Sequence, residues 1–267
     1  MPETTVESVK LKIAFVGAGN VAWHLSQALA TAGHQVMAVY SRSALSRTEL
    51  ASALPEAIAV SSSDFTGFAI DLVIISVPDA ALAQVAKELK VTPGTVVAHT
   101  SGSQPLAILH QIPGARPAVF YPLQTFSKTK AVNLQEVPIL LEAEQEDALQ
   151  LVETLAKSIS SKVYKVDSEH RRHLHLAAVF ACNFTNHLLG ISQKLLQEAN
   201  LPGELLQPLI HETVAKAMQQ HPFKIQTGPA IRHDENVIQA HLQMLQQHPR
   251  LQELYQKLTE SIQTTKV

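Results

Sequence analysis

The chain has 267 residues, of which 46% are hydrophobic and 16% are charged, and its 21 Lys and Arg side chains nearly balance its 23 Asp and Glu side chains. This length suits one large domain or two modest ones, with a sizeable buried core. The near-balance of charge excludes a broadly basic nucleic-acid-binding protein, and it gives no reason to expect attraction to an anionic membrane.

Cysteine usage and hydropathy predict a soluble cytoplasmic protein. Cys182 is the single cysteine, so it cannot form a disulfide within the chain, and we expect a reducing compartment. No uninterrupted apolar run approaches the roughly 18 residues of a membrane span. The most apolar segment, residues 72–77, is flanked by Asp71 and Pro78. The first ten residues are polar and include two acids, which is unlike a signal peptide.

Residues 1–166 are predicted to form an α/β domain. Short β-rich runs alternate there with helix-length stretches, which indicates a Rossmann-like, mostly parallel sheet covered on both faces. The expected strands are 11–17, 35–41, 71–77, 95–100, 115–121, 137–142 and 161–166, and the expected helices are 21–32 and 80–89.

Residues 167–267 are predicted to form an all-α domain, with helices over 168–200, 203–220, 234–247 and 250–263. A helix over 168–200 would be about 50 Å long at about 1.5 Å per residue, so we expect it to reach into the first domain or a second subunit. The amphipathic helices leave more apolar face than so small a domain can bury alone. This predicts a homodimer through the helical half.

A glycine-rich turn joins the first predicted strand to the first helix, with the sequence Gly17-Ala18-Gly19-Asn20-Val21-Ala22. Gly17 permits a tight turn, Gly19 lets the backbone approach a pyrophosphate, and Ala22 replaces the third glycine where helix and strand pack. The free amides at the helix start would receive phosphates. We therefore expect residues 17–21 to bind a dinucleotide, although an ordinary strand-to-helix turn has the same local pattern.

The second strand ends in Tyr40-Ser41-Arg42, where an NAD enzyme would carry an acid for the ribose hydroxyls. Residues 11–48 contain no Asp or Glu. Arg42 and Ser41 suit a 2′-phosphate instead, so NADP is the expected cofactor. The alternative is that these are solvated loop residues.

Two further loops follow predicted strands and should border the ligand crevice of a doubly wound sheet. One contains Val77 and Pro78, which we expect to contact the cofactor. The other contains His99, a candidate catalytic residue, and Ser101, a candidate substrate-binding residue. A Ser-Gly-Ser turn is also common loop chemistry, which is the alternative for this segment.

The long predicted helix carries His175, Asn183 and Asn186. At about 100° per residue, Asn186 lies some 20° and Asn183 some 80° from His175, so the three share one face. His175 and Asn183 would orient a carbonyl and relay a proton, while Asn186 would bind substrate. Alternatively, these groups satisfy one another in a helix interface. We expect Cys182 to be a small buried residue.

Two other polar clusters have weaker interpretations. His170, His173 and His175 have a spacing that suggests zinc, but two neighbouring arginines disfavour a dication and we expect no metal. Arg232, in the turn Thr227-Gly-Pro-Ala-Ile-Arg-His-Asp234, is a candidate anchor for a substrate carboxylate, and Asp234 is a candidate helix N-cap.

The segments GAGNVA, YSR, SVPD, HTSGS, YPLQTFS and TGPAIRHD together resemble a family that joins a Rossmann-like domain to a C-terminal helical domain of unknown function. Its members are named as NADP-dependent or deazaflavin-dependent oxidoreductases, and the chain is similar more broadly to the 6-phosphogluconate dehydrogenase-like superfamily. The resemblance implies NADP binding in the first domain, a catalytic cleft between the domains and helix-mediated dimerisation. It implies no substrate.

The chain departs from better-known members of that superfamily. No Lys lies between Lys165 and Lys194, where β-hydroxyacid dehydrogenases and ketopantoate reductase carry a catalytic one, and the Ser-Gly-Ser-Gly-Pro-Ala run of pyrroline-5-carboxylate reductase is missing. We therefore expect an NADP-dependent oxidoreductase that transfers hydride to or from a small carbonyl or imine. The alternative is a non-enzymatic NADP(H)-binding sensor or regulatory protein.

Overall fold

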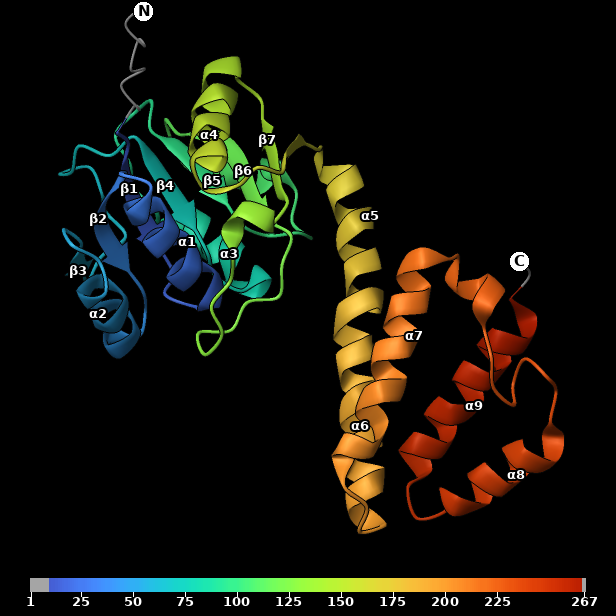
Figure 1. Cartoon of the computed structure of the whole chain (residues 1–267). Helices are drawn as coiled ribbons and strands as arrows, with labels where there is room; N and C mark the ends of the chain where they lie inside the picture. Colours follow the sequence, from blue (N-terminus) through green and yellow to red (C-terminus); the bar gives the residue numbers. More distant parts are fainter. Residues whose placement is uncertain (1–9, 266–267) are drawn as a thin grey trace, which may run out of the picture. The chain divides into compact units, whose positions relative to one another are not determined.

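A computed structural model describes residues 10–265 of the chain (Figure 1). The segment 1–9, on which the expectation of no signal peptide mostly rests, lies outside the described residues. The chain forms two compact units, residues 1–186 and 187–267. The domain boundary predicted after residue 166 stays a prediction; that position is where the sheet has ended and the long helix is about to begin.

The first unit is built on one sheet of eight strands in the order β3-β2-β1-β4-β5-β6-β7-β8. The strands are β1 Lys12–Val16, β2 Gln35–Tyr40, β3 Ile58–Val60, β4 Leu72–Ile75, β5 Val96–His99, β6 Arg116–Pro122, β7 Ile139–Ala143 and β8 Val163–Lys165. Neighbouring strands run parallel except β6 and β7, which are antiparallel. The predicted Rossmann-like, mostly parallel sheet is therefore confirmed.

The chain reverses direction across the sheet at β1. It runs outward from β1 through β2 to β3 and then returns to place β4 on the other side of β1. Such a switch point opens a ligand crevice at the carboxyl ends of the two strands. The glycine-rich turn follows β1 directly, so it lies at this crevice.

Helices cover both faces of the sheet. They are α1 Asn20–Thr31, α2 Ala44–Ser52, α3 Asp79–Glu88 and α4 Glu146–Ile159, with short 3₁₀ turns at Leu106–Gln111 and Leu134–Glu136. The helix α5 Ser168–Ala178 follows the last strand and leads away from the sheet (Figure 1). Alternation along β1 divides the core, because Ile13 and Phe15 pack with α1 and α4 while Ala14 and Val16 pack with α3. The elements α2, β3 and α4 were not predicted from the sequence, although α4 buries residues at helical spacing.

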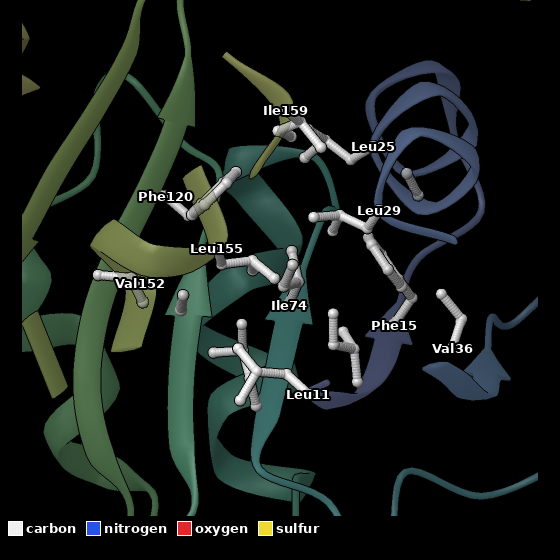
Figure 2. Close-up of a cluster of buried hydrophobic side chains, with 14 of the residues drawn as sticks. Leu11, Phe15, Leu25, Leu29, Val36, Ile74, Phe120, Val152, Leu155 and Ile159 are labelled. Carbon is white, nitrogen blue, oxygen red and sulfur yellow. The ribbon is translucent and has the colours of Figure 1, made fainter. Parts of the chain in front are cut away.

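Figure 2 shows the larger of the two buried clusters. Phe15 and Ile74 from the strands meet Leu29 of α1 and Leu155 of α4, and all four are fully buried. Burial of each such side chain contributes about 1.5–3 kcal/mol. This packing fixes α1 on the sheet, and with it the turn that precedes α1.

After Asp167 the described residues form helices joined by turns and loops, with no strand, as predicted. Beyond α5 it contains a π-helical segment at Val179–Phe184, then α6 Thr185–Glu198, α7 Gln207–Gln219, α8 Glu235–Met244 and α9 Pro249–Thr264, with 3₁₀ turns at Gly203–Leu206 and Pro222–Ile225. Pro249 is the first residue of α9, where its missing N–H costs no hydrogen bond.

One helix departs from the hydropathy expectation. Ser168–Glu198 is continuous over 31 residues, and an 18-residue window within it has a mean hydropathy of 1.3 and no buried residue. By length and composition alone, this helix is apolar enough to cross a membrane. Counting uninterrupted apolar runs missed it because His, Asn and Thr interrupt the pattern. A helix packed against protein passes the same test, so the finding by itself is weak evidence of a membrane span.

Candidate active site

Gly17 forms the turn that follows β1, and the backbone conformation at this position requires a glycine. Its φ is +107°, and a Cβ there would lie 2.1 Å from the carbonyl oxygen of Ser76. The Gly17 N–H donates to the carbonyl of Tyr40 at 2.8 Å. Gly17 therefore holds the ends of β1, β2 and β4 together at the crevice.

The start of α1 is open to a ligand. A Cβ on Gly19 would meet no atom within 4 Å, so the space in front of this residue is empty of protein. Gly19 is also the N-cap of α1, and no side chain caps the helix there. The first amides of the helix thus lack side-chain acceptors and are available for phosphate oxygens.

A pocket of about 220 Å³ lies at this turn, beside a second one of about 470 Å³. Of the residues predicted to bind the cofactor, Gly17, Ala18, Gly19, Ser41, Arg42, Val77 and Pro78 line the first pocket. Asn20 and Val21 do not line it. The Asn20 side-chain amide donates to the carbonyl of Phe126 at 3.0 Å, and Val21 packs against the core.

Arg42 is exposed and lines both pockets. The lining of the first pocket includes no acid, while Arg47 donates to the Ser41 carbonyl at 3.0 Å and so braces the loop. The open Gly19, the uncapped helix start and a free guanidinium at the end of β2 fit a dinucleotide that carries a 2′-phosphate.

The next two loops along the sheet edge are joined by hydrogen bonds between side chains. Thr100, after β5, lies with its Oγ1 3.3 Å from the Oγ of Ser76, after β4. Ser103 Oγ donates to the carboxylate of Asp79, the first residue of α3. These bonds connect the loop after β4, which lines the pocket, to the loop after β5.

His99 is fully buried at the end of β5. Its Nδ1 accepts from the Ser101 N–H at 3.1 Å, which leaves the proton on Nε2, and that atom has no hydrogen-bond partner among the described residues. Burial, reinforced by the positive charge of Arg171, lowers the pKa of His99 to about 4. The imidazole is therefore uncharged at neutral pH, and the predicted catalytic role of His99 stays a prediction.

Ser101 is buried as well, and its hydroxyl forms hydrogen bonds within its own loop. The Oγ accepts from the backbone N–H of Ser103 at 3.2 Å and of Gln104 at 3.0 Å. The hydroxyl hydrogen is not used by these two bonds, so the predicted role of Ser101 in substrate binding stays a prediction. The geometry also favours Ser101 as a support for the turn that carries Gly102.

Gly102 lies against a Tyr–His pair. The hydroxyl of Tyr121, near the end of β6, lies 3.1 Å from Nδ1 of His175 in α5. A Cβ on Gly102 would lie 2.6 Å from that nitrogen and 2.7 Å from Cζ of Tyr121, so any larger residue would displace the pair. Burial and then the negative charge of Asp79 raise the pKa of Tyr121, so the phenol keeps its proton at neutral pH.

Tyr121 was missed as a site residue. The segment YPLQTFS contributes to the family resemblance, and its Tyr121 lies near the carboxyl end of β6. That position borders the crevice of a doubly wound sheet, and it is the signal that would have identified the residue.

Arg171 anchors the start of α5. Its side chain is fully buried, pairs with the carboxylate of Glu142 and donates to the Gln104 carbonyl at 2.6 Å and to Ser168 Oγ at 3.1 Å. Arg171 precedes His175 by one helical turn. The network therefore fixes both the helix that carries His175 and the loop that carries Gly102.

The His170, His173 and His175 side chains have separate partners. His170 pairs with Asp167, His173 bonds to a backbone carbonyl, and His175 meets Tyr121. Among residues 10–265, no group of three or more His, Cys, Asp or Glu side chains is arranged to hold a metal ion.

The π-helical segment Val179–Phe184 changes the predicted face of the long helix. Its wider turns rotate the residues that follow, so the offsets of 20° and 80° from His175, which assumed a uniform α-helix, do not apply. Asn183 and Asn186 are exposed, and their predicted roles stay predictions. Cys182 is exposed rather than buried, which corrects the expectation of a buried residue.

Arg232 belongs to the second unit. It is exposed in the turn before α8, and its role as a substrate anchor stays a prediction. Asp234 accepts from the Val237 N–H at 3.4 Å, which confirms it as the N-cap of α8. The catalytic cleft expected between the domains also stays a prediction.

Known proteins resemble the chain over nearly its whole length. Residues 2–122 match the model of a Rossmann-like domain, and residues 137–262 match that of a domain of unknown function, DUF2520. A Bacteroides fragilis protein provisionally named an NADP oxidoreductase is 39% identical, with 96% of this chain and 99% of that one covered and a TM-score of 0.88. No curated protein matches.

Two more distant structures share the fold. A Thermotoga maritima protein is 23% identical, with 94% of this chain and 96% of that one covered and a TM-score of 0.65. A reductive aminase from Aspergillus terreus, solved with NADPH and ethyl levulinate, is 16% identical, with 95% and 93% covered and a TM-score of 0.68.

Proposed function

Since this chain belongs to the family that joins a Rossmann-like domain to the domain of unknown function DUF2520, we propose that it is an NADP-dependent oxidoreductase acting on a small carbonyl or imine. Its relative from Bacteroides fragilis carries the name of an NADP oxidoreductase, and the reductive aminase of the same fold was solved with NADPH. The pocket at Gly17, with Arg42 at its rim, supports the same cofactor here.

The Tyr121–His175 pair is the observation that carries the proposal of an enzyme rather than a sensor. A bound NADPH supplies a hydride. The Tyr121 hydroxyl oxygen and the His175 Nδ1 lie 3.1 Å apart, so the two atoms can share a proton. The loop between this pair and the cofactor pocket is hydrogen-bonded to the loop after β4. In that place the pair can give a proton to a carbonyl oxygen or an imine nitrogen as charge develops there. A protein that only senses NADP(H) has no need of such a pair.

The roles of the individual residues follow from this arrangement. Tyr121 and His175 hold and pass the proton, and Gly102 leaves room for both. His99 and Ser101 belong to the wall of the site, because their polar atoms are buried or engaged by the loop. Asn183 and Asn186 on the same long helix remain proposed contacts for the reacting group and the substrate.

A screen of NADPH oxidation tests the proposed function. Absorbance of the reduced nicotinamide is followed while the protein is offered keto acids, ketones with amines, and cyclic imines. Steady oxidation with at least one class supports an oxidoreductase. Tight binding of NADPH without turnover of any class supports the sensor instead.

Arg42 is expected to set the preference for NADPH over NADH. A charge-assisted pair between its guanidinium and the 2′-phosphate contributes about 1.5–3 kcal/mol, so Arg42→Ala should remove most of the difference between the two affinities. Calorimetric titration with both cofactors measures it. Thr48→Ala, in the neighbouring α2, is the control. Unchanged selectivity in Arg42→Ala contradicts the assignment.

We expect a homodimer through the helical half. The long helix Ser168–Glu198 exposes Leu176, Phe180, Phe184 and Leu188, and none of its apolar window is buried within the chain. Apolar area of this extent on a helix favours association. Light scattering at micromolar concentration should give twice the mass of the chain, and Phe180→Glu should lower it to one chain. A monomeric mass for the unaltered protein excludes the dimer.

A further inference from the structure

The edge between the cofactor pocket and the Tyr–His pair carries a negative charge. Asp79 directly follows Pro78, which lines the pocket. Its carboxylate accepts from Ser103 Oγ, and Ser103 adjoins Gly102, on which Tyr121 and His175 converge. Asp79 thus connects the loop after β4, whose Pro78 lines the pocket, to the loop that carries Gly102.

No cation neutralises Asp79 within the described residues. It is exposed, and no Lys, Arg or His nitrogen of residues 10–265 lies within 4.0 Å of its carboxylate. The guanidinium of Arg171, which acts to lower the pKa of Tyr121, is fully buried and paired with Glu142. The charge of Asp79 reaches the Tyr121 hydroxyl, since it contributes to the raised pKa of that phenol.

We propose that Asp79 binds the positive charge of the substrate, which is a protonated imine or the corresponding amine rather than a keto acid. This inference rests on the proposed function and names its substrate class. An iminium next to an unpaired carboxylate recovers part of the interaction that it loses with water, whereas a carboxylate substrate would be repelled.

The electron balance of the reaction agrees with a cationic substrate. A hydride adds to the iminium carbon, the π pair of the C=N bond moves to nitrogen, and the positive charge is lost as NADPH becomes NADP⁺. The neutral amine, held beside Asp79, then takes a proton from the Tyr121–His175 pair. In the reverse direction, the amine returns the proton and gives up the hydride.

A structural role for Asp79 has a different signature. An acid in the first turn of α3 also stabilises the helix dipole, and Ser103 bonds to it. Asp79→Asn keeps an acceptor for Ser103 and removes only the charge. A structural role predicts equal effects on all ligands, whereas a counter-ion role predicts an effect on cations alone.

Three probes with one ring test the charge preference: cyclohexylamine, cyclohexanol and cyclohexanecarboxylate, which are a cation, a neutral molecule and an anion at pH 7. Each is titrated calorimetrically into the full chain saturated with NADP⁺. We expect the amine to bind most tightly, and Asp79→Asn to weaken it about ten-fold while cyclohexanol is unaffected. Asp71→Asn, at the opposite end of β4, is the matched control and should change nothing.

Salt provides a second measurement that does not depend on a variant. Affinity of the unaltered protein for the amine should fall as ionic strength rises, and affinity for the alcohol should stay constant. Asp79→Glu, which keeps the charge, should retain the preference for the amine.

Tightest binding of the carboxylate overturns the inference and favours Arg232 as the anchor. Equal binding of all three probes, or no detectable binding of the amine to the NADP⁺-loaded protein, also overturns it. Failure of NADP⁺ itself to bind is a separate result, since it contradicts the proposed function.

Discussion

Arg171→Met is expected to lower the free energy of unfolding by about 3–5 kcal/mol, because it leaves the partner of a buried ion pair uncompensated. The substitution also removes the donors to the Gln104 carbonyl and to Ser168. The side chain of Glu142 is 20% exposed, so water partly solvates the remaining charge and the lower end of the range is expected. Urea unfolding followed through Trp23, the single tryptophan, measures the change.

Arg172→Met is the matched control for this prediction. Arg172 is the next residue on α5 and is exposed, so its loss should change stability by no more than about 0.5 kcal/mol. Equal effects of the two substitutions would contradict the assignment of Arg171 as the anchor of α5. Glu142→Gln should destabilise the protein in the same direction, because it leaves the buried guanidinium without its counter-charge.

His175→Ala is expected to lower turnover by about 10²- to 10⁴-fold once the screen has supplied a substrate, since a positioned proton donor contributes about that much to rate. Affinity for NADPH should change little, because His175 is not among the residues that line the cofactor pocket. Single-turnover kinetics and calorimetry separate these two effects.

His173→Ala is the matched control for the catalytic prediction. His173 is exposed on the same helix and bonds only to the carbonyl of Glu169, so its removal should leave turnover unchanged. Tyr121→Phe removes the other half of the pair and should act in the same direction as His175→Ala. Full activity in His175→Ala would exclude the proton-donor role.

The local sequence contained enough information to predict the cofactor pocket. The turn at Gly17, the helix start after it and Arg42 at the end of the next strand belong to one continuous strand–turn–helix–strand segment. Short-range backbone geometry decides such a segment, and a left-handed glycine at its centre is readable from residue type. The same holds for the mostly parallel sheet, which follows from alternating apolar strands and helices.

The proton-bearing pair and its support depended on the tertiary structure. Tyr121 and His175 are 54 residues apart, and Arg171 and Glu142 are 29 apart, so their meeting is decided by which strands lie next to each other and by the reversal at β7. The burial of His99 and the π-helical segment after His175 are also results of packing. By itself, the sequence of this protein predicted where a nucleotide would bind, because most residues that line that pocket are neighbours along the chain, within 16–46. Only the tertiary structure decided which side chains meet beside it, because long-range contacts depend on how the whole sheet is assembled.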